Sequence, residues 1–182
     1  MSGSSFPFIR KDILRQNLDE AFNHVVTLLP FTESSTYNEA AKSAFRKTII
    51  IYMASIIEAL LFSVLDNNFT DEEVAEHYSA WELKDKNVLY VVDEKHEIVA
   101  GTYKKINSKT GKDKMNLGHV NKFLKTKNII SKSLHDKIDE VRELRNDQHI
   151  GNHKKVKSYS KNDLEKAFSV AKDVKEFVKN NS

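Results

Sequence analysis

One long apolar run constrains the fold of this chain more than any other feature of its sequence. From Thr48 to Leu65 the residues are apolar or carry a small hydroxyl group, and Glu58 is the one charged residue among them. The run belongs to a longer helical pattern over residues 37–67, in which two apolar stripes lie side by side. A helix that is apolar over most of its circumference belongs at the centre of a bundle. We therefore expect residues 37–67 to form the core helix.

The same run is close to the lower length limit for a membrane span, which is the alternative interpretation. Glu58 lies in its middle, where a carboxylate facing lipid would be costly, and no second run of this kind follows. The start of the sequence also lacks the charged and apolar regions of a signal peptide. We expect a soluble core helix, no membrane partner and a cytoplasmic location.

The composition favours long helices. The 182 residues include only five Gly and two Pro, which is too few for the many tight turns of a β-sandwich or barrel. Cysteine is absent, so a disulfide scaffold and a thiolate metal site are both excluded. No metal-ligand spacing and no phosphate-binding glycine loop stand out, and the histidines without such spacing among themselves are His24, His77, His96, His119 and His135. We expect neither a metal nor a cofactor.

Local patterns divide the chain into helices and one hairpin. Apolar spacing predicts helices over residues 9–29, 37–67, 117–125 and 133–148, and Ser160 with Asp163 should cap a last one. Thr70 and Glu73 have capping-box spacing and predict a short helix that extends to about Leu83. Residues 88–92 and 97–106 are typical of a β-hairpin. The expected fold is mainly α: an up-and-down helical bundle in a single domain over residues 1–182, with a β-hairpin and basic loop inserted at 85–115.

Positive charge is unevenly distributed. Residues 104–132 contain nine lysines and a single acid, Asp113, so this stretch carries +8 while the rest of the chain carries −5. A second basic cluster lies at residues 154–161. Lysine-rich loops with aromatic neighbours bind phosphate backbones, although a solvated surface is the plainer interpretation. The candidate RNA contacts are Lys104, Lys105, Lys122, Lys125, Lys154 and Lys155.

The helix expected at 133–148 breaks its own apolar pattern. Leu134, Ile138 and Val141 form its apolar seam, and the next position on that seam is Arg145. By the same periodicity His149 and Arg142 lie slightly further round the helix. A local violation of this kind is expected at a functional site.

These residues suit metal-independent cleavage of RNA. A histidine with a near-neutral pKa exchanges a proton, a guanidinium holds phosphate oxygens, and Asn146 can donate an orienting hydrogen bond. A base would deprotonate the ribose 2′-OH, which attacks the adjacent phosphate while a cation stabilises the transition state. The alternative is an Arg at a helix end that pairs with Asp139 or Glu143, beside an ordinary surface histidine.

The segment Leu144-Arg-Asn-Asp-Gln-His-Ile-Gly151 resembles the motif of HEPN domains. These are small α-helical domains of prokaryotic toxins, abortive-infection proteins and RNA-processing nucleases, marked by an Arg, a polar residue that is often Asn, and a His a few positions on. Residues 45–61 resemble the family's core helix, which often carries a lone acid, here Glu58. The helix opened by Ser160 is also similar to the family's last helix. The likeness covers residues 37–67 and 133–181.

The spacing of the motif leaves two arginines as candidates. Three residues separate Arg145 from His149, which is shorter than the family's usual spacing, whereas six separate Arg142 from His149. Arg145 therefore matches by its Leu-Arg-Asn context and Arg142 by its distance. The resemblance implies that Glu58 orients one of these arginines; a hydroxyl network between Glu58 and Ser55 is the alternative.

The resemblance also implies a homodimer with the Arg–His segments of two protomers in one cleft. We expect Arg145, His149, Asn146, Arg142 and Glu58 to form the site of a metal-independent endoribonuclease of defence or toxin–antitoxin type, with an antitoxin or regulatory protein as a further partner. The alternatives are a non-catalytic HEPN-like module that binds RNA or protein, and a purely structural dimeric bundle.

Overall fold

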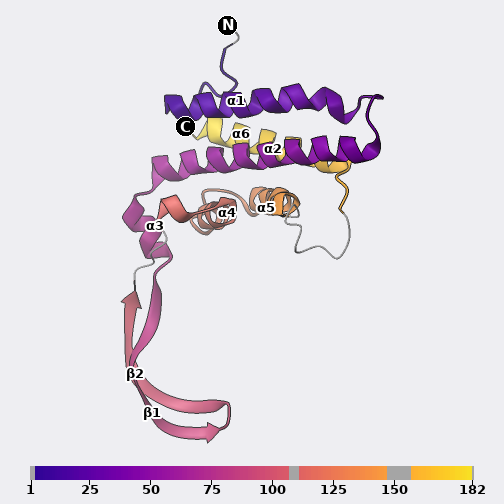
Figure 1. The fold of residues 1–182 in the computed structure, drawn as a ribbon. Coiled ribbons are helices and arrows are strands. Elements are labelled where there is room, and N and C mark those ends of the chain that lie inside the picture. Colours follow the sequence, from indigo (N-terminus) through magenta and orange to yellow (C-terminus); the bar gives the residue numbers. More distant parts are fainter. Residues whose placement is uncertain (1–2, 107–110, 147–156, 182) are drawn as a thin grey trace. The chain divides into compact units, whose positions relative to one another are not determined.

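The computed structural model describes residues 3–106, 111–146 and 157–181. The predictions for His149, Lys154 and Lys155 concern residues 147–156, which lie outside the described part. The elements follow in this order: α1 Asp12–Leu28, η1 Leu29–Thr32, α2 Glu39–Asn68, α3 Asp71–His77, β1 Ala80–Asp93, β2 His96–Ile106, η2 Lys112–Lys114, α4 Leu117–Thr126, α5 Lys132–Asn146 and α6 Lys161–Asn180. The prediction of a mainly α fold with a small β-hairpin is confirmed (Figure 1).

The chain divides into two compact units. The first is a helical bundle made of residues 1–68 and 116–182, and the second comprises residues 69–115 with α3 and the hairpin. Both parts of the bundle contribute to its core, because α2 packs against α1, α4, α5 and α6.

Helix α2 lies at the centre of the bundle, as its apolar circumference predicts. Figure 1 shows α1 on one side of it and α4 and α5 on the other. An ion pair of 2.7 Å between Lys11 and Asp66 joins the start of α1 to the end of α2, so these two helices are antiparallel. The backbone N–H of Tyr159 donates to Ser43 Oγ at 2.8 Å, which places the start of α6 beside the start of α2. Helix α6 therefore runs in the same direction as α2.

The core of the bundle is built mainly on α2. The largest fully buried side chains of α2 are Ile49, Ile50, Ile57, Leu60, Leu61 and Leu65. Among the described helices, α2 alone is long and apolar enough to span a membrane. Of its most apolar 18-residue stretch, 61% is buried inside the protein.

Short-range capping signals were predicted correctly. Thr70 and Glu73 form a reciprocal capping box at the start of α3, and Ser160 and Asp163 form one at the start of α6. Each box satisfies backbone N–H groups that would otherwise lack a partner in the first turn. The structure adds a third box, in which the side chain of Asn116 accepts from the His119 N–H at the start of α4.

The hairpin is longer than the sequence predicts. Helix α3 ends at His77 and β1 begins at Ala80, so the prediction that this helix extends to Leu83 is wrong. Leu83 instead pairs with Tyr103 of β2, and Trp81 pairs with Lys105. The aromatic and apolar side chains of residues 78–83 favour a strand as well as a helix, and cross-strand pairing decides between the two.

Close packing of the backbone explains one glycine of the hairpin. The register of β1 and β2 shifts between Lys84 and Asn87, where Asp85 has a φ of 52°. Opposite this bulge, a Cβ on Gly101 would lie 2.7 Å from Leu83 Cδ1 and 2.8 Å from the Lys84 carbonyl oxygen. No larger residue fits there without a shift of the strands.

Candidate functional site

The apolar seam of α5 ends in an arginine, as predicted. Ile138 and Val141 are fully buried, and Arg145 occupies the next position on the same face with 19% of its side chain exposed. A guanidinium so far out of solvent requires compensation by an acceptor or a counter-charge. The structure therefore places a cation at the end of a helix face that otherwise packs into the core.

The counter-charge is Glu58 of α2. Arg145 Nη1 donates to Glu58 Oε2 at 2.8 Å, and 23% of the Glu58 side chain is exposed. Ser55 Oγ donates to the carbonyl oxygen of Ile51, so the alternative network between Glu58 and Ser55 is wrong. The predicted contact between Glu58 and an arginine of α5 is confirmed, and the arginine is Arg145. This charge-assisted hydrogen bond ties the last turn of α5 to the middle of the core helix.

Arg142 is held in a different way. Its Nε donates to Asp139 Oδ1 at 2.7 Å one turn earlier in α5, and its Nη2 lies 3.9 Å from Glu143 Oε1. The hydrogen bond from Arg142 lowers the pKa of Asp139, and in return Asp139 raises the pKa of Arg142. A Cβ on Gly118 of α4 would lie 3.2 Å from Arg142 Cδ, so the stem of this side chain packs over Gly118. Arg142 thus matches the structural alternative, an arginine paired on its own helix.

Asn146 is the last residue of α5 and is partly buried. His149, the proposed proton-transfer group, lies outside the described residues. The described chain resumes at Lys157, whose Nζ lies 5.5 Å from the centroid of the Tyr159 ring. Arg145 and Glu58 are therefore the members of the predicted site that the structure brings together, with Asn146 adjacent in sequence.

Tyr159 links the end of α5 to the start of α2. Its hydroxyl donates to the carbonyl oxygen of Leu144 at 3.5 Å, and its backbone N–H donates to Ser43 Oγ at 2.8 Å. Burial raises the pKa of the Tyr159 phenol, and Asp163 adds to the effect. The phenol therefore stays protonated at neutral pH, as a hydrogen-bond donor must. In the sequence, Tyr159 is an aromatic residue within the basic cluster at residues 154–161, and nothing in its spacing indicates this link.

Arg46 is the buried cation that sequence reasoning missed. Its side chain donates to the carbonyl oxygens of Thr32 at 3.0 Å and Tyr159 at 3.4 Å, and it pairs with Glu39 at 3.2 Å. This hydrogen bond lowers the pKa of Glu39. The Nε of Arg46 is buried and has no hydrogen-bond partner among the described residues. Arg46 lies on the same face of α2 as Ile49, Ile50 and Met53, so it interrupts an apolar face in the same way as Arg145 does.

The predicted lysine contacts lie in both units. Lys104 and Lys105 belong to β2, and Lys105 Nζ pairs with Glu76 Oε1 at 2.9 Å. Lys122 is exposed and Lys125 partly exposed on α4 of the bundle. Lys104 and Lys105 thus belong to the unit with the hairpin, and Lys122 and Lys125 belong to the helical bundle.

No group of three or more His, Asp or Glu side chains that could hold a metal ion occurs among the residues that the structure describes. Comparisons of the chain with protein-family models, with curated proteins and with solved structures find no match. In the described part of the chain, the candidate site therefore consists of Glu58, Arg145 and Tyr159.

Proposed function

We propose that this chain is a metal-independent endoribonuclease of the HEPN type. In this proposal Arg145 holds the scissile phosphate, His149 transfers the proton, and Asn146 orients the substrate or the histidine. Glu58 and Tyr159 are positioning residues, since they act through Arg145 and through the last turn of α5. Arg142 belongs to the packing between α4 and α5.

The ion pair between Glu58 and Arg145 is the observation that carries the proposal. An apolar core helix gains nothing from a lone carboxylate, and a helix seam gains nothing from a lone guanidinium, because both must leave water. Paired at 2.8 Å, they hold one guanidinium in a fixed orientation at the end of α5. Pre-organised charge of this kind stabilises the charge that develops on a phosphate during reaction.

The reaction needs no group beyond this chain and water. His149 as base takes the proton of a ribose 2′-OH, and the 2′-oxygen attacks the adjacent phosphorus. The bond from phosphorus to the 5′-oxygen breaks, and this oxygen takes up a proton from water. The products are a 2′,3′-cyclic phosphate and a 5′-hydroxyl end. Arg145 balances the negative charge on the phosphoryl oxygens throughout.

RNA binding would draw on the basic residues at 104–132 and 154–161. A homodimer would bring two copies of Arg145 and His149 to one cleft and double the positive charge there. The resulting field favours a polyanion and makes binding dependent on salt. We also propose a cytoplasmic location and an antitoxin or regulatory protein as a partner that covers this cleft.

The test is cleavage of a defined RNA pool in excess EDTA. We expect wild-type protein to yield 5′-hydroxyl ends, and His149→Ala and Arg145→Ala to lower the rate by about 10²-fold or more, the usual scale for a lost acid–base group or charge-stabilising donor. Arg10→Ala and His24→Ala are matched controls, because both residues are exposed and lie next to or in α1, outside the predicted site. Equal cleavage by wild type and by His149→Ala would contradict the proposal.

A second candidate is a non-catalytic module that binds RNA or a protein. It is favoured by the state of the two arginines, since Arg142 and Arg145 are each paired with a carboxylate. This candidate predicts RNA binding that weakens steeply with salt, without cleavage in any buffer. A salt titration of RNA binding, run beside the cleavage assay, separates the two functions.

A further inference from the structure

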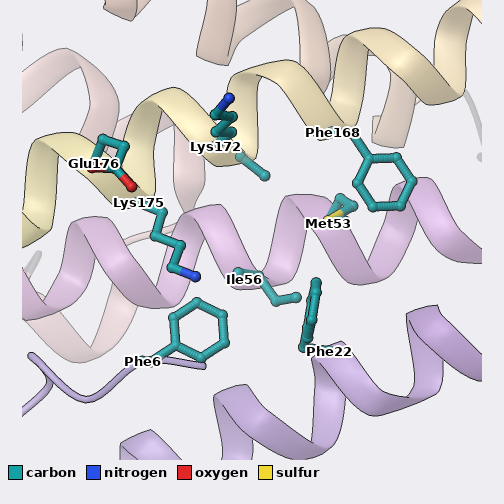
Figure 2. A pocket seen from close by; sticks show the side chains of 9 residues that line it. Phe6, Phe22, Met53, Ile56, Phe168, Lys172, Lys175 and Glu176 are labelled. Atoms are coloured by element: carbon teal, nitrogen blue, oxygen red, sulfur yellow. The ribbon is translucent and has the colours of Figure 1, made fainter. Parts of the chain in front are cut away.

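The bundle contains a pocket that the proposed function does not use. It has a volume of about 290 Å³ and is formed by the N-terminal segment, α1, α2 and α6 (Figure 2). This volume is near the lower end of the range of about 300–1,000 Å³ that is typical of small-molecule sites. Its apolar lining is Phe6, Phe22, Met53, Ile56, Phe168 and Ala171.

The walls of the pocket are fixed. Met53 and Ile56 form part of the buried face of α2, and Phe6 is almost fully buried. The Phe6 ring meets the Phe22 ring edge to face at a centroid distance of 6.2 Å. The segment that carries Phe6 is tied to α1, because the Ser5 N–H donates to Asp19 Oδ1 at 2.8 Å. The cavity is therefore bounded by side chains that are buried and packed against one another.

The mouth of the pocket carries positive charge. Three charged residues of α6 line it, namely Lys172, Lys175 and Glu176. Lys175 Nζ lies 5.1 Å from the centroid of the Phe6 ring, and Figure 2 shows this side chain reaching from α6 toward that ring. Neither lysine forms an ion pair with a carboxylate of the described residues, whereas Glu176 lies 3.9 Å from Lys179.

We infer that this pocket binds a small amphiphilic anion, namely an alkyl carboxylate whose chain fills the cavity and whose head pairs with Lys175. Three aromatic rings and the Met53 thioether provide no hydrogen-bond donor, so the buried part of the ligand is hydrocarbon. The Lys175 ammonium group beside the Phe6 ring favours a negative head and repels a positive one. Burial of the alkyl chain supplies the affinity, and the carboxylate head determines the orientation of the ligand in the pocket.

Decanoate is a suitable probe, with 1-decanol as its uncharged analogue. Protein labelled with ¹³C at the methionine methyl groups reports binding directly, since Met53 lines the pocket and Met115 belongs to the other unit. We expect decanoate to shift the Met53 methyl resonance saturably and to leave that of Met115 unchanged. The affinity for decanol should be at least tenfold lower.

Substitutions distinguish the contribution of the carboxylate head to binding from that of the alkyl chain. The double variant K172A/K175A should bind decanoate at least tenfold more weakly and decanol as well as wild type does. Lys161→Ala, an exposed lysine of the same helix outside the pocket, is the matched control and should change neither. Ala171→Leu places added carbon atoms in the cavity and should weaken the binding of both ligands.

Three results would overturn the inference. The first is the lack of a saturable shift of Met53 with decanoate. The second is equal affinity for decanoate and decanol that the double variant does not change, which would indicate a non-specific apolar cavity. The third is a Met53 shift that depends on protein concentration without ligand, because a second copy of the chain would then cover this face. The lysine variants alter exposed or partly exposed side chains, so the test stands even where Ala171→Leu does not fold.

Discussion

Glu58 and Arg145 are 87 positions apart in the chain, and their side chains meet at 2.8 Å. Each lies on a helix face that is otherwise apolar, and each has less than a quarter of its side chain exposed. Loss of one partner therefore leaves the other charged group poorly solvated, which costs more than the pair contributes when it is intact.

Glu58→Ala should lower the free energy of unfolding by about 1–3 kcal/mol, the usual cost of an unpaired buried polar group. Glu58→Leu combined with Arg145→Met should recover much of that loss, because neither charge remains. Urea denaturation followed by circular dichroism measures both. Glu140→Ala removes the exposed pair with Lys166 and is the control, with an expected change below about 0.5 kcal/mol. A double variant no more stable than Glu58→Ala would contradict this account.

Arg46→Ala should destabilise the bundle by about 2–4 kcal/mol, since it leaves buried carbonyl oxygens of Thr32 and Tyr159 without their donor. Lys47→Ala, at the next position of α2, should change the stability by less than about 0.5 kcal/mol. Amide hydrogen exchange provides a second measurement. Protection should fall at Tyr159 and in the first turn of α6 in the Arg46 variant only, and uniform loss across the bundle would contradict a local anchoring role.

The pair between Asp139 and Arg142 predicts a pH dependence. Arg142 lowers the pKa of Asp139 in the folded state, so the unfolded state binds the proton more readily. The stabilisation is fully present above the unfolded value of about pH 4 and is lost as pH falls through the lower folded value. Carboxyl ¹³C titration should find the folded pKa of Asp139 below about 3.9. Asp139→Asn should flatten the stability curve between about pH 2 and pH 5, and an unchanged slope would contradict the prediction.

Gly101→Ala should disrupt the hairpin, because its Cβ would lie within 3 Å of Leu83 and of the Lys84 carbonyl oxygen. A two-stranded sheet has little stability to lose, so a cost of about 1–3 kcal/mol suffices to unpair it. Cross-strand contacts between Leu83 and Tyr103 in the NMR spectrum report the pairing. Gly3→Ala is the control, since a Cβ there meets nothing within 4 Å. A hairpin that keeps this register in Gly101→Ala would exclude close packing as the reason for the glycine.

The parts of the fold that depend on short-range signals could be predicted from the sequence. The capping box at Ser160 and the central position of α2 needed only spacing and apolar content. The boundary between α3 and β1 could not be predicted in this way. Residues 80–83 gain their strand partners from residues 103–106, and no local preference contains that pairing.

In the candidate site, too, spacing along the sequence predicts some features and tertiary packing decides the others. Periodicity showed that Glu58 and Arg145 interrupt apolar faces, but it could not choose between Arg142 and Arg145 as the partner of Glu58. That choice follows from the packing of α5 on α2, with Arg142 directed over Gly118 instead. Arg46 was missed although its position on α2 breaks the pattern in the same way.

The order of the helices along the chain has a consequence for synthesis on the ribosome. Helix α2 is completed at Asn68, whereas α6, which covers one of its apolar faces, begins only at Lys161. At ordinary rates of translation the gap lasts on the order of ten seconds. During that interval the nascent chain carries the apolar surface of α2 without its last neighbour. This protein should therefore be a client of chaperones that bind exposed hydrophobic segments as they emerge.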